Sequence, residues 1–328
     1  MGDFSSPSPQ FSKGLFVKGC DVEMANNAMK RTRNSMSTPR RQQIILAYVL
    51  LLPSLVFLGM FTFYPMVRGL IASLHEWSVL TPPRYLGLDN FREAFSNPYF
   101  KIAITNSIKY LVIVPVIQML SIILAILVNR ETPGIGLFRA AYYIPVVTPM
   151  VTVAITWGWI FDSSGVLNYL LLSLGLIKEP ISWLVNPTTA LGSVMFVTMW
   201  KGLGYYMVMY LAGLQSIPKE LEEAAVIDGA NGWQVTRHVT IPLLRPSILI
   251  CSTLSAMAAL RVFDEVFVMT EGGPMGKTLV AGLYIYQQAF ESYRFGYAAA
   301  VSLVLGVIVM VFTVINFRAM ARGGLTYY

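Results

Sequence analysis

Residues 44–64 read IILAYVLLLPSLVFLGMFTFY and contain no charged side chain. The stretch is too long for the apolar region of a signal peptide, and a helix of about 20 such residues spans the roughly 30 Å hydrocarbon core of a membrane. Five more segments of the same character follow along the chain. The six candidate spans are 44–66, 107–128, 138–161, 188–214, 246–270 and 295–317. The sequence therefore predicts an all-α polytopic membrane protein with six transmembrane helices.

The composition agrees with this class of protein. Hydrophobic residues make up 55% of the 328 residues and charged residues only 12%, roughly half the charged share of a soluble domain. The chain carries 24 Lys and Arg against 17 Asp and Glu. These basic residues stand in short clusters between apolar runs, which is typical of positive-inside topology and not of a nucleic-acid-binding protein. More than half of them are cytoplasmic if both termini are, and the N-terminal tail contributes much of this bias.

Three regions follow from this pattern. Residues 1–43 are polar and are expected to form a disordered cytoplasmic extension, residues 44–320 the transmembrane domain, and residues 321–328 a cytoplasmic tail. An alternative for the extension is a segment that lies on the membrane surface. Its basic residues would be Lys13, Lys18, Lys30, Arg31 and Arg33.

The Cys and His residues show no pattern of disulfide or metal chemistry. Cys20 lies in the polar tail and Cys251 in an apolar run, so we expect no disulfide between them. His75 and His238 occur without HExxH or CxxC spacing, so we expect no metal site.

The densest pattern of the chain lies in the connection between the fourth and fifth spans, where residues 216–242 read SIPKELEEAAVIDGANGWQVTRHVTIP. Ser216 can cap a helix that Pro218 opens, with acidic residues in its first turns. Gly229 suits the C-terminal end of that helix, where a positive φ is often needed. A second short helix, 232–239, then leads to Pro242. These local features fit a plain connector as well as a docking element.

The spacing within this connection resembles the EAA signature of ATP-binding-cassette importer permeases. Glu223-Ala224-Ala225 is followed after three residues by Gly229, and nine residues later by Val239-x-Ile241-Pro242. Both intervals match the signature, while Val239 and Ile241 replace its commonest Ile and Leu. The flanking sequence AGLQSIPKELEEAAVIDGAN is similar to the carbohydrate-uptake branch of the family.

Other marks extend the resemblance over about 44–320. They are Tyr64-Pro65, Arg139-x5-Pro145, Gly272-Gly273-Pro274 and the run Phe295–Ala300. The Gly-Gly-Pro turn resembles the half of the heteromeric pair that is related to the larger membrane subunit of the maltose importer.

The resemblance implies a non-catalytic permease subunit whose coupling helix, between helices 4 and 5, docks into an ATPase subunit. The implied coupling residues are Glu220, Glu222, Glu223, Ala224, Ala225, Asp228, Gly229 and Pro242. The implied partners are a second homologous permease, two ATPase subunits that use ATP and Mg, and an external solute-binding protein. The implied location is a bacterial inner membrane, and no cofactor is implied in this chain. The implied cargo is a sugar or sugar-like solute, and the resemblance does not decide among disaccharides, oligosaccharides, polyols and glycerol phosphates.

A candidate solute site lies in the fourth span, where Lys201 interrupts an apolar run. Similarity to the maltose importer places solute contacts at Thr198, Lys201, Gly202, Tyr205 and, in the fifth span, Ser255. The alternative is snorkelling by Lys201 with close helix packing at Gly202 and Gly204. Apolar residues stand at other positions of that site, which argues against maltose as the solute. These are Val146, Met150, Ala259 and Val262.

Two charged residues of the fifth span, Arg261 and Asp264, are three apart, the spacing at which helical side chains meet. We expect an ion pair or a gate element there, in preference to a direct solute contact.

Three other functions fit less well. Residues 272–278, GGPMGKT, resemble a nucleotide-binding loop, but GxxxxGK[ST] needs glycine where Glu271 stands. A secondary transporter, the main alternative, commonly carries acidic relays or broken helices in both halves of a repeat, whereas here Asp264 and Glu265 are the carboxylates well inside a span. A membrane enzyme would need a catalytic or metal constellation that the sequence lacks.

Overall fold

The computed structural model describes residues 37–78, 82–129 and 133–321 and is almost entirely helical. The expected N-terminal extension, with Cys20, and the expected C-terminal tail fall almost wholly outside these residues. The chain divides into two units, 1–67 and 68–328.

The first unit is one apolar helical stretch. It comprises α2 (Ser37–Leu58), the π-helical turn η1 (Gly59–Phe63) and the start of α3 (Tyr64–Ser73). From Gln42 onward every side chain of α2 is exposed, and Leu50 and Phe57 are 69% and 64% exposed. A helix that is apolar on all sides and unburied in its own chain is suited to lipid contact.

Within the described residues, four helical stretches are long and apolar enough to cross a membrane: Gln42–Ser73, Pro98–Val128, Arg245–Thr270 and Phe295–Ala319. A fifth is added if α7 (Ile135–Val147) and α8 (Met150–Ile160), which meet at 100°, form one broken span. The break has a local cause, because Thr148 is extended and Pro149 lacks the N–H that a continuing helix needs.

The remaining predicted span corresponds to α10 (Ala190–Gln215), which has 26 residues. It is long enough to cross a membrane, but Lys201 and several tyrosines and glycines make it less apolar than the others. The structure thus supports four or five spans by length and composition, where the sequence predicted six.

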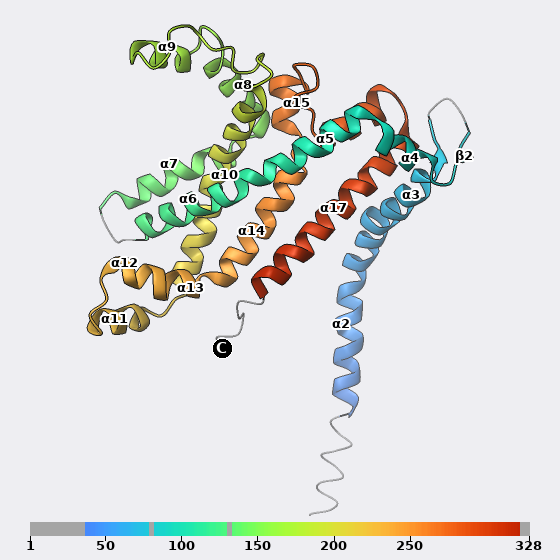
Figure 1. Cartoon of the computed structure of the whole chain (residues 1–328). Coiled ribbons are helices and arrows are strands. Elements are labelled where there is room, and N and C mark those ends of the chain that lie inside the picture. The colour runs from blue at the N-terminus through green and yellow to red at the C-terminus, as the bar shows by residue number, and fades with distance from the viewer. Residues whose placement is uncertain (1–36, 79–81, 130–132, 322–328) are drawn as a thin grey trace, which may run out of the picture. The chain divides into compact units, whose positions relative to one another are not determined.

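In the second unit α10 contacts α6 (Ile113–Val128), α7, α14 (Arg245–Leu260) and α15 (Asp264–Thr270), and α17 (Phe295–Ala321) lies beside α14 (Figure 1). The contiguous segments α5 (Pro98–Lys109), η2 (Tyr110–Val112) and α6 form one helical stretch. This stretch lies beside α10 through α6, and α7 also contacts α10. The helix α14 contacts both α6 and α17. The helix α15 contacts α8.

Shorter elements complete this unit. They are β1 (His75–Glu76), β2 (Arg84–Tyr85), α4 (Asp89–Ser96), α9 (Val166–Ser173), α11 (Lys219–Ile227), α12 (Gly232–Val235), η3 (Thr236–Thr240), α13 (Ile241–Leu243), α16 (Ala281–Tyr286) and η4 (Gln287–Glu291). The two strands pair antiparallel, with His75 opposite Tyr85.

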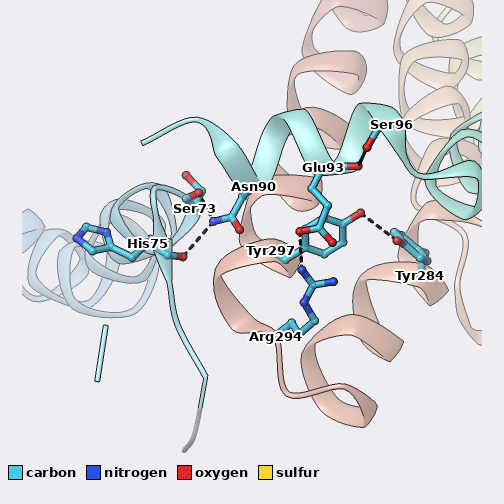
Figure 2. Close-up of polar contacts among 8 residues, drawn as sticks. All are labelled: Ser73, His75, Asn90, Glu93, Ser96, Tyr284, Arg294 and Tyr297. Carbon is cyan, nitrogen blue, oxygen red and sulfur yellow. Dashed lines mark hydrogen bonds and ion pairs between the residues drawn. The ribbon is translucent and has the colours of Figure 1, made fainter. Parts of the chain in front are cut away.

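Polar contacts tie α4 to its neighbours (Figure 2). The Asn90 side chain is buried and donates to the carbonyl oxygens of Ser73 and His75, at 2.8 and 3.0 Å. The Arg294 guanidinium donates to Glu93 at 2.6 Å, which raises the pKa of Arg294, and it lies over the ring of Tyr297. These contacts join the segment before the second span to the start of α17.

Candidate functional sites

A cavity of about 330 Å³ lies among α6, α10, α14, α15 and the α7–α8 pair. This volume is within the range of small-molecule sites, about 300–1,000 Å³. The lining residues are Ile113, Val114, Ile117, Val146, Met150, Thr198, Lys201, Gly202, Tyr205, Tyr206, Ser255, Ala258, Ala259 and Glu265. All five residues that the sequence predicted for a solute site are therefore brought to one cavity. Its walls are mostly apolar, with polar groups at a few positions.

Helical periodicity explains how α10 supplies four of them. Thr198, Lys201 and Tyr205 are spaced three and four residues apart, so they share one face of the helix. Ser255 reaches the cavity from α14, where it is buried and accepts a hydrogen bond from Gln118 at 2.6 Å. Gln118 in turn accepts one from the Tyr210 hydroxyl. This chain of hydrogen bonds joins α6, α10 and α14 beside the cavity.

Lys201 contacts the break between α7 and α8. Its Nζ donates to the carbonyl oxygen of Thr148 at 2.9 Å and lies 3.5 Å from that of Val146. Carbonyls at the end of a helix have no partner within the helix, so a cation stabilises them. The snorkelling alternative does not describe this geometry, because the ammonium stays among the helices.

Glu265 lines the same cavity and was missed as a site residue. It is only 7% exposed, and its Oε1 accepts a hydrogen bond from Thr198 Oγ1 at 2.7 Å. The available signal was a carboxylate within an apolar stretch, which in a membrane protein marks a functional candidate by default.

Three glycines of α10 lie in close packing, two of which, Gly202 and Gly204, the alternative interpretation named. A Cβ on Gly204 would lie 1.9 Å from the carbonyl oxygen of Tyr142, and one on Gly213 would lie 2.4 Å from Ser247 Oγ. A Cβ on Gly202 would meet the flexible end of Ile117 at 2.6 Å. Gly202 therefore serves both the packing and the cavity wall.

The expected pairing of Arg261 with Asp264 rests on a continuous helix, and that premise is wrong. The α14 helix ends at Leu260, and α15 begins only at Asp264. Side chains three apart meet only while the helix continues. Both residues are exposed, and among the described residues no ion pair joins them. Asp264 instead occupies the first turn of α15, where the helix dipole favours a carboxylate.

The connection between α10 and α14 forms α11 as predicted, with a different start. Ser216 is the C-cap residue of α10, and its hydroxyl donates to the carbonyl oxygen of Gly213 at 2.7 Å. The prediction that Ser216 caps α11 is therefore wrong. Pro218 precedes the first residue of α11. Gly229 has φ +87° and donates to Val226, while Ala230 donates to Ala225. These two bonds make a Schellman ending. The sequence predicted the positive φ of Gly229 at the end of this helix.

The second short helix is α12 with η3, and its start carries a capping box that was not predicted from the sequence. Asn231 accepts from the Gln234 backbone N–H at 2.9 Å, and the Gln234 side chain accepts from the Asn231 N–H at 2.8 Å. The signal was the Asn-x-x-Gln spacing, a variant of the usual pattern.

The predicted coupling residues separate into two groups. Glu220, Glu223, Ala224, Asp228 and Gly229 are exposed, whereas Ala225 and Pro242 are half-buried. Glu222 is half-buried too and accepts a hydrogen bond from Thr240 at 2.9 Å, so it joins α11 to η3.

Large apolar side chains stand among the exposed coupling residues. Val226, Ile227 and Trp233 are 58%, 85% and 67% exposed. The surface of α11 and α12 therefore carries bulky apolar side chains next to Ala224. Exposed apolar groups beside carboxylates are suited to a partner protein.

The chain is similar to known transport proteins. The family described as "Binding-protein-dependent transport system inner membrane component" matches residues 99–322. The lactose transport system permease protein LacF of Rhizobium radiobacter is 34% identical over 290 residues, covering 87% of this chain and 97% of LacF. The trehalose/maltose transport system permease protein MalF of Thermococcus litoralis is 32% identical over 292 residues, with 87% and 97% covered.

A solved structure shares the fold. It is that of a bacterial alginate ABC transporter in complex with an alginate pentasaccharide-bound periplasmic protein. A chain of that complex matches with a TM-score of 0.76 and 24% identity, covering 87% of this chain and 97% of the other.

Proposed function

Because the chain belongs to the family of binding-protein-dependent transport system inner membrane components, we propose that it is the permease subunit of an ATP-binding-cassette importer for a sugar or sugar-like solute. The observation that carries the proposal is the single cavity that gathers Thr198, Lys201, Gly202, Tyr205 and Ser255. The relatives named for lactose and for trehalose and maltose support a carbohydrate as the cargo.

The membrane topology we propose has six spans, with α10 as the span that is less apolar than the rest. At about 1.5 Å per residue, its 26 residues extend about 39 Å, which exceeds the roughly 30 Å of hydrocarbon. Thr198 and Lys201 lie on the face of α10 that lines the cavity, so these polar groups need not contact lipid. Both termini lie in the cytoplasm, on the side that the basic residues favour.

The cavity has the chemistry of a sugar site. Tyr205 offers an aromatic face to the apolar side of a sugar ring, while Thr198 and Ser255 offer hydroxyls. The apolar lining at Val146, Met150 and Ala259 differs from the polar pattern of a maltose site.

Transport is driven through α11. Its exposed face, with Glu223, Ala224 and Ile227, docks on an ATPase subunit, which binds ATP and Mg. Closure of the ATPase pair moves α11 and opens the helices to the outside, where a binding protein delivers the solute; hydrolysis resets them inward. Because a ligand shifts an equilibrium only through its different affinity for the two states, the docking must differ between them. A second homologous permease and two ATPase subunits complete this assembly.

The test is uptake by proteoliposomes that contain the complete importer with its binding protein. We expect uptake only with ATP inside and binding protein outside. A Tyr205→Ala variant should lose most uptake, while Tyr169→Ala, at an exposed tyrosine of α9, should not. Uptake driven by a sodium or proton gradient without ATP would contradict the proposal and favour an ion-coupled transporter.

A further inference from the structure

Glu265 is the one residue of the cavity lining with a carboxylate, and the predicted solute site did not include it. It lies in the first turn of α15, directly after the irregular residues that follow α14. Its side chain faces α10, because Thr198 Oγ1 donates to its Oε1 at 2.7 Å. Both residues line the cavity, so this pair forms part of the wall that a solute would touch.

The Glu265 carboxylate has fewer hydrogen-bond donors around it than it can accept. A carboxylate has about four positions that accept hydrogen bonds, and burying it is costly unless these are used. Within the described residues, the Thr198 side chain and the backbone N–H of Glu265 itself donate to this carboxylate, and no ion pair includes it. The Thr198 hydroxyl carries one proton and also lies 3.2 Å from the carbonyl oxygen of Val194, so it satisfies Glu265 only in part.

The lysine of the cavity does not compensate for this shortage. Lys201 directs its ammonium to the carbonyl oxygens of Thr148 and Val146, at the break between α7 and α8. Its positive charge stabilises that helix end, and it reaches Glu265 only as a weaker, longer-range attraction. The polar capacity that the cavity offers to a solute is therefore mainly that of a hydrogen-bond acceptor.

We propose that Glu265 accepts hydrogen bonds from hydroxyl groups of the transported solute and selects neutral, polyhydroxylated solutes against anionic ones. This inference rests on the proposed function and deepens it. Neighbouring hydroxyls of a sugar or polyol can each donate to one carboxylate oxygen, and hydrogen bonds to a charged group are the strong ones. A sugar acid or sugar phosphate would bring a second negative charge into a cavity of low dielectric, where like charges repel strongly. Specificity then arises from repulsion of the wrong solute as well as from contacts to the right one.

The experiment uses the complete importer in proteoliposomes and pairs of solutes that differ in charge. The pairs are lactose with lactobionate, trehalose with trehalose 6-phosphate, and glycerol with glycerol 3-phosphate. For the wild type we expect uptake of the neutral member of at least one pair, at a rate at least tenfold above that of its anionic partner.

The variants are Glu265→Gln and Glu265→Ala, with Asp264→Asn as the matched control. Asp264 is the adjacent carboxylate, exposed and outside the cavity lining. We expect about threefold lower neutral uptake for Glu265→Gln, which keeps one acceptor oxygen, and more than tenfold lower uptake for Glu265→Ala. The ratio of neutral to anionic uptake should fall at least tenfold in Glu265→Gln and stay unchanged in Asp264→Asn. A folding defect would lower both members of a pair equally, so the ratio reports selection.

Three outcomes would overturn the inference. One is wild-type uptake of an anionic member as fast as its neutral partner, and another is an unchanged ratio in Glu265→Gln. The third is a complex that hydrolyses ATP in response to its binding protein but takes up neither member of any pair, which would also refute the proposed solute class. Either of the first two outcomes would overturn the role of Glu265 and leave the proposed importer function unaffected.

Discussion

Lys201 Nζ donates a hydrogen bond to the carbonyl oxygen of Thr148, 2.9 Å away, and so joins the middle of α10 to the break between α7 and α8. The break exposes the last carbonyls of α7, and Lys201 is the cation that meets them. Lys201, the residue from which the solute site was predicted, therefore also stabilises the α7–α8 wall of the cavity.

Replacing Lys201 with Met should disturb this wall. Because hydrogen bonds to a charged group are worth about 1.5–3 kcal/mol, we expect a clear fall in the melting temperature of the purified complex and loss of uptake. Lys201→Arg should recover part of the stability. Lys178→Met, at an exposed lysine between α9 and α10, is the control. Equal melting temperatures for Lys201→Met and the control would show that the contact contributes nothing.

Gly204→Ala should impair the packing of α10 against α7. The new Cβ would lie 1.9 Å from the Tyr142 carbonyl oxygen, a backbone atom that cannot rotate away. Overpacking of this kind typically costs about 1–3 kcal/mol. Gly192→Ala on the same helix has open space within 4 Å and should be neutral or stabilising. Thermal unfolding of the two variants checks this, and an equal stability would be inconsistent with close packing at Gly204.

Tyr110→Phe should leave stability unchanged or raise it by about 1 kcal/mol. The Tyr110 hydroxyl is buried and, in the described part of the chain, has no hydrogen-bond partner, so removing it relieves a desolvation cost. Tyr210→Phe is the matched contrast, because it deletes a hydroxyl that donates to Gln118. We expect it to destabilise the protein by about 1 kcal/mol. The reverse order of the two melting temperatures would contradict the hydrogen-bond assignment.

Around α4, the buried contact should matter more than the half-exposed ion pair. Asn90→Ala leaves the carbonyls of Ser73 and His75 without their donor, and we expect a loss of about 1–3 kcal/mol. Glu93→Gln weakens the contact to Arg294 and should cost well under 1 kcal/mol, because the side chains of Arg294 and Glu93 are 42% and 44% exposed. The measurement is thermal unfolding at low and high salt. A larger effect for Glu93→Gln would reverse this ranking.

Much of this architecture could be predicted from the residues. Long apolar runs predicted the membrane class, and resemblance to the maltose importer named Thr198, Lys201 and Tyr205, which the structure brings to one cavity. The sequence did not reveal that Pro149 breaks the third span, since prolines are tolerated inside α2 and α7 at Pro53 and Pro145. The helix breaks where Thr148 is extended, and the Thr148 carbonyl oxygen accepts a hydrogen bond from Lys201, which is distant in sequence.

Other predictions failed because local spacing does not show where a helix ends or which distant residues meet. Arg261 and Asp264 were paired by counting along a helix, but the chain leaves the helix between them. Ser216 has the composition of an N-cap and yet serves the end of the preceding helix. Glu265 is placed in the site by the cavity that it lines and by its contact with Thr198, which is 67 positions away.

Binding-protein-stimulated ATP hydrolysis by the reconstituted complex tests most directly whether α11 couples ATP hydrolysis to movement of the helices around the cavity. Glu223→Ala removes an exposed carboxylate of α11, and Gly229→Val places a branched side chain at φ +87°. Gly232→Ala, in open space at the start of α12, is the control. We expect at least a tenfold loss of stimulated hydrolysis and of uptake in the first two variants and wild-type values in the control. Unchanged hydrolysis and uptake in both variants would contradict this coupling.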